Sequence, residues 1–190
     1  DYFFDKRNQI NFYAYCNPYS KEDHGYMDLQ LETHDSLSNS RYDRKKEDRN
    51  MATFYSLYYL HSFDKPGHNL SMDLSHYHYR GNFSSSLLPA MINNSEPLIN
   101  YISLKADYSR PRGKHMNMES GLKSSIAFQD YTQTGGYTNQ EIRNAVYASV
   151  AYGREKFQAM AGLRFSNFRN RANDNQINVL PTLFLQYKIS

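Results

Sequence analysis

The 190-residue sequence predicts an all-β fold, namely an antiparallel transmembrane β-barrel built from long strands. Apolar and polar residues alternate with a period of two along most of the chain, whereas helical periodicity is hard to find. The alternating segments are 11–16 residues long, compared with about 5–6 residues in typical soluble sheets. Short turns alternate with long polar connections, as they do in barrels whose turns face one side of a membrane and whose loops face the other.

Eight membrane-crossing strands are expected, at residues 8–18, 48–63, 68–82, 98–109, 115–129, 141–152, 157–168 and 177–189. Short turns are expected at residues 5–8, 64–67, 110–114 and 153–156, and longer polar segments at 19–47, 83–97, 130–140 and 169–176. Residues 26–35 also alternate, but a crossing there would place a short turn on the loop side. We therefore interpret them as a strand extension above the membrane.

The clearest hairpin covers residues 141–168. Folding it about Arg154 and Glu155 places Tyr152 opposite Phe157 and Val150 opposite Ala159. The two apolar faces then coincide, as a buried or lipid-facing register requires, with Asn144 as the one polar exception.

Two further hairpins follow from the same pattern. In residues 98–129, a turn at 110–114 places Ser109 opposite His115, and Lys105 then lies across from Glu119 as an opposite-charge pair. Residues 50–82 turn at 64–67, but their first strand is apolar on both faces, so that its register stays open.

Composition excludes several classes of protein. The net charge of +3 does not indicate a nucleic-acid binder, and a single cysteine, Cys16, excludes an intrachain disulfide framework. The mean hydropathy of −0.81 and the lack of any long apolar run exclude helical membrane spans.

A soluble antiparallel sandwich is the alternative fold, with the apolar face inside. Against it, aromatic residues cluster near strand ends, at Tyr2, Phe3, Phe4, Phe63, Tyr108, Tyr152, Phe157 and Tyr187. The opposite face is also strongly charged, which suits a wet or plugged lumen. The candidates for lining that lumen are Lys105, Asp107, Glu119, Lys123, Arg143 and Arg164.

Five stretches in order carry a resemblance to a known family: residues 1–12 (DYFFDKRNQINF), 104–125 (LKADYSRPRGKHMNMESGLKSS), 144–153 (NAVYASVAYG), 159–165 (AMAGLRF) and 179–189 (VLPTLFLQYKI). Together they resemble the C-terminal β-barrel domain of TonB-dependent-receptor-like outer-membrane proteins of the Bacteroidetes type. The resemblance implies a barrel of about 22 strands around a plug, in a Gram-negative outer membrane. Residues 1–190 would form part of that one barrel domain, with the plug domain and the remaining strands absent.

The resemblance also implies a role and partners. The whole protein would take up an unidentified nutrient, and its partners would be outer-membrane lipid, the rest of the barrel and plug, and a TonB-type energy-coupling protein acting through the plug. There are two alternatives: a complete eight-stranded barrel with a structural or adhesive role, and a soluble β-rich binding module. No nucleic acid, cofactor, resident metal or enzyme activity is expected.

Four further groups of residues suggest other chemistry. His76 and His78 share one strand face and are a possible metal pair, although an interfacial position beyond Leu74 explains them better. Ser71, Asp73, Ser75 and His76 contain the residue types of a hydrolase triad without an oxyanion-hole signature. The basic run at residues 41–46 is interpreted as a solvated outer loop. Arg143 and Arg164, two registers apart on facing strands, are candidates for a basic patch toward the lumen, although contact with plug carboxylates or water explains them better.

Overall fold

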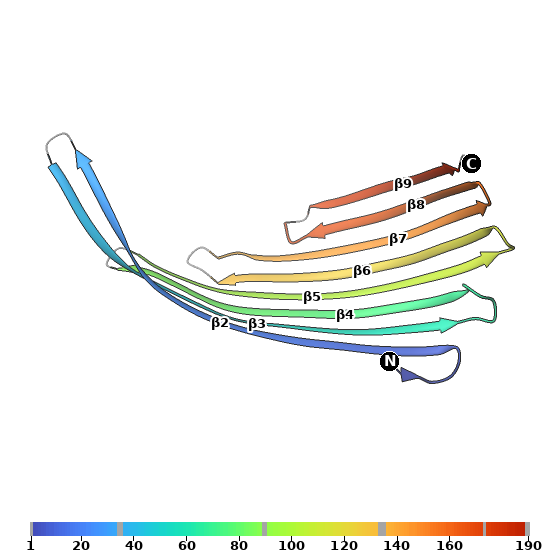
Figure 1. Cartoon of the computed structure of the whole chain (residues 1–190), viewed down its shortest axis with the longest axis horizontal. Helices are drawn as coiled ribbons and strands as arrows, with labels where there is room; N and C mark the ends of the chain where they lie inside the picture. Colours follow the sequence, from blue (N-terminus) through green and yellow to red (C-terminus); the bar gives the residue numbers. More distant parts are fainter. Residues whose placement is uncertain (1, 34–35, 89–90, 133–135, 173, 189–190) are drawn as a thin grey trace.

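The computed structural model describes residues 2–33, 36–88, 91–132, 136–172 and 174–188. Within these residues nine strands form one antiparallel sheet, each strand pairing with the strands before and after it in the chain (Figure 1). The strands are β1 (Tyr2–Phe3), β2 (Asn8–Thr33), β3 (Ser36–Ser62), β4 (Asn69–Leu88), β5 (Met91–Arg112), β6 (Met116–Thr132), β7 (Thr138–Arg154), β8 (Phe157–Asn170) and β9 (Asn175–Tyr187). The predicted antiparallel all-β fold is confirmed.

The eight predicted crossings correspond to β2 through β9, and the short turns all lie at one end of the sheet, on the right of Figure 1. Several strands continue past their predicted ends. β2 and β3 pair from Asn8↔His61 as far as Thr33↔Ser36, so that most of the expected loop 19–47 is a paired ribbon. β4 and β5 likewise extend into the expected loop 83–97. The backbone ladder continues there because hydrogen bonding between strands does not depend on an apolar face.

The extension predicted for residues 26–35 is confirmed as far as residue 33, whereas residues 34–35 lie outside the described residues. Residue 189 of the last predicted strand also lies outside them; β9 ends at Tyr187. The ribbon of β2 and β3 rises beyond the loop ends of the other strands, at the upper left of Figure 1.

Two predicted registers are wrong. Tyr152 lies opposite Ala159 rather than Phe157, because β7 continues to Arg154 before a two-residue turn at 155–156. Lys105 lies opposite Lys123 rather than Glu119, because β5 continues to Arg112 and reverses at Gly113, whose φ is +72°. Both registers differ from the predicted ones by an even number of residues, so the assignment of residues to the two faces is unaffected.

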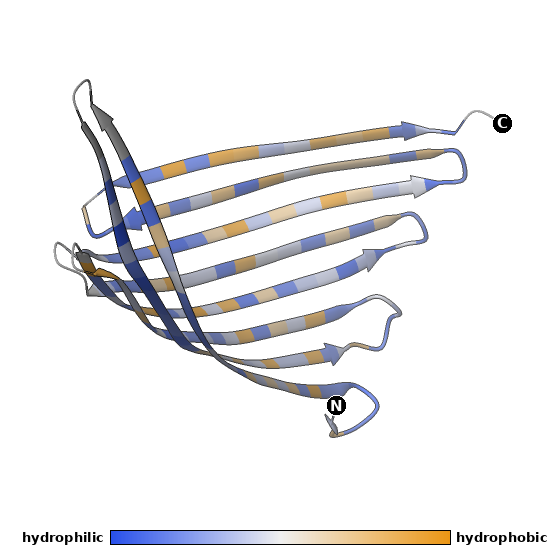
Figure 2. Ribbon diagram, turned by 60° about the vertical axis from the view of Figure 1, so that its left-hand side comes forward, coloured by the Kyte–Doolittle hydropathy of each residue, from blue (hydrophilic) through white to orange (hydrophobic). Residues whose placement is uncertain are grey.

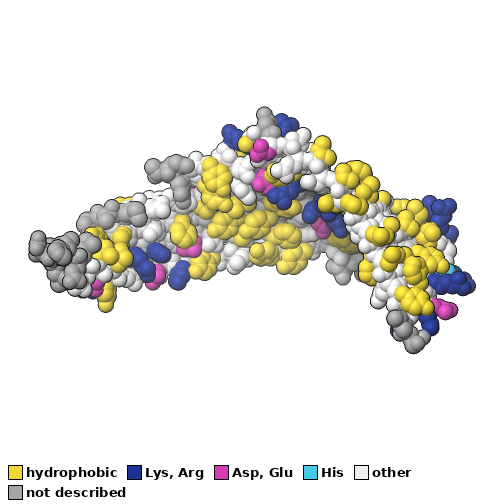
Figure 3. Space-filling view, turned by 90° about the horizontal axis from the view of Figure 1, so that it is seen from above, with side chains coloured by type: hydrophobic (Ala, Val, Ile, Leu, Met, Phe, Trp, Pro, Cys, Tyr) yellow, Lys and Arg dark blue, Asp and Glu magenta, His cyan; other side chains and the backbone are white. Residues whose placement is uncertain are grey.

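The two faces of the sheet differ in polarity, and the alternation is visible along each ribbon in Figure 2. One face carries apolar side chains that are largely exposed, at Phe12, Leu57, Met72, Leu74, Ile102, Leu104, Met118, Leu122, Ile126, Val146, Val150, Leu163, Phe165, Val179, Leu183 and Leu185. In the view from above, hydrophobic side chains gather at the middle of the molecule and toward its right, and charged side chains lie at both ends and along the upper edge (Figure 3).

The opposite face is the inner one. All four side chains that are buried among the described residues, Ala52, Ser103, Ser125 and Ala145, belong to it. Its side chains also line a hollow that crosses β5 to β9. Side chains converge on the concave side of a curved sheet and spread apart on its convex side, which explains this difference in burial. We call the two faces the inner face and the outer face.

Aromatic and imidazole rings gather where the short turns join the strands. Phe63 and His68 stack with their ring centres 4.0 Å apart, and the His68 Nε2 lies 2.9 Å from the Tyr108 Oη. Tyr152 and Phe157 form a second ring contact across the turn between β7 and β8. Such rings, each with an apolar body and a polar edge, are enriched at membrane–water interfaces.

The sheet is open. β1 covers only Gln9 and Ile10 on the outer edge of β2, and β9 pairs with β8 alone. The described residues of β9 and β2 do not pair with each other. The part of the chain that the structure describes contains no helix long and apolar enough to cross a membrane.

Candidate functional site

All six lumen candidates lie on the inner face. Lys105 and Asp107 occupy odd positions of β5, and the pairings carry odd positions through β6 and β7 to even positions of β8. The remaining four candidates are Glu119, Lys123, Arg143 and Arg164. Their role in lining a lumen stays a prediction.

A tyrosine ties three strands together on this face. Tyr147 of β7 lies opposite Gly121 of β6, which in turn lies opposite Asp107 of β5. The Tyr147 hydroxyl donates a hydrogen bond to Asp107, so its ring lies across the glycine. A Cβ at Gly121 would come within 2.5 Å of the Tyr147 ring and 2.7 Å of a backbone oxygen, so only glycine leaves room for this ring.

The expected ion pair between Lys105 and Glu119 does not form, because the register places Lys123 across from Lys105. Instead the Lys105 Nζ lies 2.6 Å from the Asp107 carboxylate two residues along the same strand. Glu119 lies opposite Ser109 and accepts a hydrogen bond from the Asn117 side chain at 3.0 Å.

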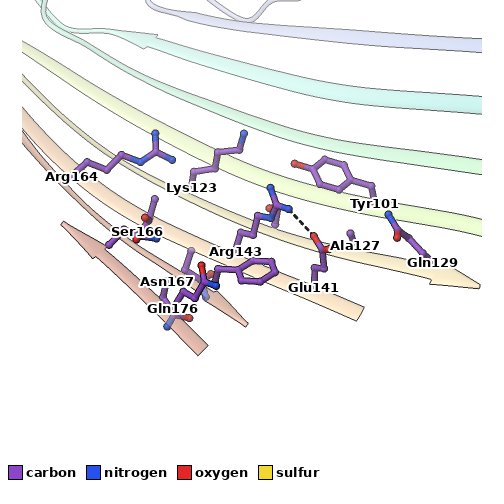
Figure 4. Close-up of a pocket in the computed structure, with 15 residues that line it drawn as sticks. Tyr101, Lys123, Ala127, Gln129, Glu141, Arg143, Arg164, Ser166, Asn167 and Gln176 are labelled. Carbon is purple, nitrogen blue, oxygen red and sulfur yellow. Dashed lines mark hydrogen bonds and ion pairs between the residues drawn. The ribbon is translucent and has the colours of Figure 1, made fainter. Parts of the chain in front are cut away.

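A hollow on the inner face crosses β5 to β9 and has a volume of about 640 Å³. We call it the inner-face pocket. Small side chains, among them Ser125, Ala145 and Ser166, form part of its lining. The buried Ala145 of β7 lies between its two cross-strand partners, Lys123 of β6 and Ser166 of β8. Long side chains from β5 to β8 reach into the same hollow (Figure 4).

Three cations line the inner-face pocket, at Lys123, Arg143 and Arg164. The Arg143 guanidinium donates a hydrogen bond to the Glu141 carboxylate at 2.8 Å, drawn as the dashed line in Figure 4, and lies 5.1 Å from the centre of the Phe168 ring. Lys123 and Arg164 form no ion pair with a carboxylate of the described residues.

Arg143 and Arg164 are farther apart than expected. Arg143 lies opposite Phe168, and Arg164 lies opposite Tyr147, so that four residues rather than two separate them along the strands. The change follows from the corrected register of β7 and β8. Both arginines still line one hollow, and Lys123 supplies the third cation from the next strand. Sequence reasoning missed the polar residues that complete the lining, chiefly Gln129, Gln176 and Asn178.

The two histidines of β4 lie on the outer face and are engaged separately. His76 stacks on Tyr55, with ring centres 6.3 Å apart, and the His78 Nδ1 lies 2.7 Å from the Asn100 side-chain oxygen. No group of three or more potential metal ligands occurs among the described residues. Their position beyond Leu74, next to a tyrosine, fits the interfacial interpretation.

The residue types of a hydrolase triad do not assemble on β4. Ser71, Asp73 and Ser75 point to the inner face, whereas His76 points to the outer face. Asp73 accepts a hydrogen bond from the Ser56 hydroxyl at 3.1 Å instead. Alternation along one strand therefore separates the histidine from the serines and the carboxylate.

The basic run at residues 41–46 is part of the ribbon of β3 rather than a loop. Lys45 bridges Glu22 at 3.0 Å and Glu47 at 2.5 Å, and Arg44 lies 3.5 Å from Asp23. The hydrogen bond from Lys45 holds the pKa of Glu22 below its usual value, and the bond to Glu47 raises the pKa of Lys45. The ribbon thus neutralises much of its own charge.

A comparison with known families agrees with this architecture. The model of the outer membrane protein beta-barrel family matches residues 61–190, which is more than half of the chain. The chain belongs to this family. No curated protein matches the chain significantly.

Membership places the chain in the bacterial outer membrane, as predicted, and accounts for the polarity of the sheet. The matched residues run from the end of β3 to the C-terminal end of the chain, and include all six lumen candidates. In this outer-membrane barrel family the outer face contacts lipid. Exposed apolar residues such as Leu183, 74% exposed, and Cys16 on β2 then contact hydrocarbon rather than water.

Proposed function

We propose that this chain forms part of the wall of a larger barrel, that of a TonB-dependent-receptor-like protein that takes up a nutrient across the outer membrane. The observation that carries the proposal is the open, curved sheet, with a polar, charged inner face and two edges that do not meet. The resemblance of five ordered stretches to such receptors of the Bacteroidetes type adds to it.

The inner face supports a wide barrel. The interior of an eight-stranded barrel is just large enough for its own side chains to fill. Here the inner-face pocket of about 640 Å³ lies beside a second hollow of about 450 Å³, and both are lined by Lys123 and Arg164. Charged side chains around such hollows suit a lumen that holds water, a plug domain or a solute.

In this proposal the remaining strands and a plug domain complete the barrel, and a TonB-type energy-coupling protein acts through the plug. The wall formed by residues 1–190 supplies lumen surface and outer loops, without catalysis of its own. The rival within the same family is a complete eight-stranded barrel with a structural or adhesive role, in which β9 closes onto β2. A soluble binding module does not fit the exposed apolar outer face or the family.

The native cysteine allows a direct test of closure. Cys16 is exposed on the outer face of β2, and Val179, Pro181 and Leu183 are exposed on the outer face of β9, which runs antiparallel to β2. The last three are replaced by cysteine one at a time in the full-length gene product in cells, and a thiol-specific cross-linker is added. The variant Phe12→Cys with Leu57→Cys, facing each other across β2 and β3, is the positive control.

In a large barrel none of the three β9 cysteines couples to Cys16, while the control pair does. Coupling of any one of them, lost again in the Cys16→Ser background, means a closed eight-stranded barrel and refutes the proposal. Energy coupling is tested separately. Deleting the gene for this protein and deleting the TonB-type partner should give the same growth defects across a panel of nutrients.

A further inference from the structure

The inner-face pocket has an excess of positive charge. Its lining contains three cations, Lys123, Arg143 and Arg164, and one carboxylate, Glu141, which gives a net charge of +2. Glu141 is already engaged with Arg143. Lys123 and Arg164 thus face a hollow without a carboxylate partner among the described residues.

We propose that the inner-face pocket binds a small solute with two or more acidic groups, carboxylate or phosphate, as it passes through the lumen. The inference rests on the proposed transport function and names the chemical class of the solute. A guanidinium matches the planar geometry of a carboxylate or a phosphate, and a lysine ammonium adds a mobile point charge.

The register arranges the three cations as a triangle. Lys123 lies opposite Ala145, Arg143 is two residues from Ala145 toward the loops, and Arg164 belongs to the row nearer the turns. Standard strand spacings put the Cα of Lys123 about 8 Å from that of Arg143 and about 12 Å from that of Arg164. Side chains of this length span those gaps, so that one small polyanion reaches more than one cation.

The rest of the lining suits an organic anion. Small side chains at Ser125, Ala145 and Ser166 leave the volume open, and Gln129, Gln176 and Asn178 offer amide groups as hydrogen-bond donors. The ring of Phe168 forms an apolar wall beside Arg143. Because the hollow is a recess in the wall of a lumen, charges there are screened less than on open surface.

Binding is tested by titration calorimetry on the purified full-length protein in non-ionic detergent. Citrate and inorganic phosphate are the two anionic probes, and glycerol is the neutral one. Citrate or phosphate should bind saturably and more weakly as sodium chloride is raised, whereas glycerol should not bind. The anion that binds more tightly identifies the acidic group. Absence of saturable binding by both anions overturns the inference.

Three variants separate recognition from folding. K123Q/R164Q should weaken binding at least about tenfold, since hydrogen bonds to charged groups are lost. R110Q/K114Q removes the same charge outside the pocket and should change affinity less than about twofold. E141Q frees Arg143 and should strengthen binding about threefold, a gain that misfolding cannot produce.

An equal loss of binding affinity in the two double variants, or weaker binding in E141Q, overturns the inference. The outcomes also separate it from the proposed function. TonB-dependent uptake without anion binding removes the inference alone. Anion binding in a barrel that the Cys16 cross-links show to be closed removes the transport proposal and leaves the pocket as an anion site.

Discussion

Val146 lies on the outer face of β7, in a row with Leu122 of β6 and Phe165 of β8. The three side chains are 44–55% exposed, although all are apolar. In the outer membrane their exposed surface contacts lipid. Replacing Val146 by arginine therefore places a cation in the hydrocarbon layer, where neither water nor a described carboxylate can solvate it.

The depth of Val146 sets the size of the effect. Tyr152, in the aromatic cluster at the turn end, is six residues away along β7. At about 3.4 Å per residue and a tilt of about 40°, Val146 lies about 15 Å deeper along the membrane normal, near the middle of an apolar band about 25 Å tall. Arginine at the midplane costs about 2–4 kcal/mol of folding free energy in such barrels.

The matched control is Ser149→Arg on the same strand. Ser149 lies on the inner face directly opposite Glu119, which offers the new arginine a carboxylate. Its free energy of unfolding should change by less than about 0.5 kcal/mol. The measurement is urea unfolding of the full-length protein in phospholipid vesicles, followed by far-UV circular dichroism. An equal loss of unfolding free energy in Val146→Arg and Ser149→Arg would show that the outer face does not contact lipid.

Two other perturbations follow from single positions. Gly121→Ala should destabilise the protein by about 1–3 kcal/mol in the same unfolding assay, because its Cβ overlaps the Tyr147 ring, whereas Gly153→Ala meets open space and should be neutral. The backbone N–H of Arg7 donates to Asp5 at 2.7 Å, and this bond chiefly lowers the Asp5 pKa below 3.8. Asp5 therefore stabilises its turn above pH 3.8, and that contribution is lost as the pH falls through the lower folded-state pKa; a carbon-13 NMR midpoint at or above 3.8 would contradict this.

The sequence predicted the two faces better than it predicted the registers. Face assignment needs only the parity of a position, and a lipid-facing stripe makes parity visible in residues such as Val146 and Val150. Register depends on where the backbone reverses. Pro111 indicated a turn, but it lies opposite Asn117 within the β5–β6 ladder, and the chain reverses only at Gly113. Side-chain patterns do not report those backbone hydrogen bonds.

The ribbon of β2 and β3 was predicted only where residues 26–35 alternate, and the rest of its length was missed for a related reason. With water on both faces, no consistent alternation of apolar and polar residues marks that remainder. A different signal was present, because opposite charges face each other across the ladder at Lys21↔Asp48, Asp23↔Lys46 and Asp28↔Arg41. Complementary charges placed symmetrically about a central point therefore predict a solvent-exposed hairpin where hydropathy does not.

To predict the inner-face pocket from the sequence, both the parity of each position and the register of the strands are needed. Parity alone grouped Lys123, Arg143 and Arg164 on one face, but their positions relative to one another depend on two strand pairings, β6 with β7 and β7 with β8, that the sequence did not settle. Two of the inner-face cations are neutralised within their own strands, Lys105 by Asp107 and Arg143 by Glu141. Ion pairs between residues two apart on one strand do not depend on the register, so they can be predicted from the sequence alone. They leave Lys123 and Arg164 as the charges available to a solute.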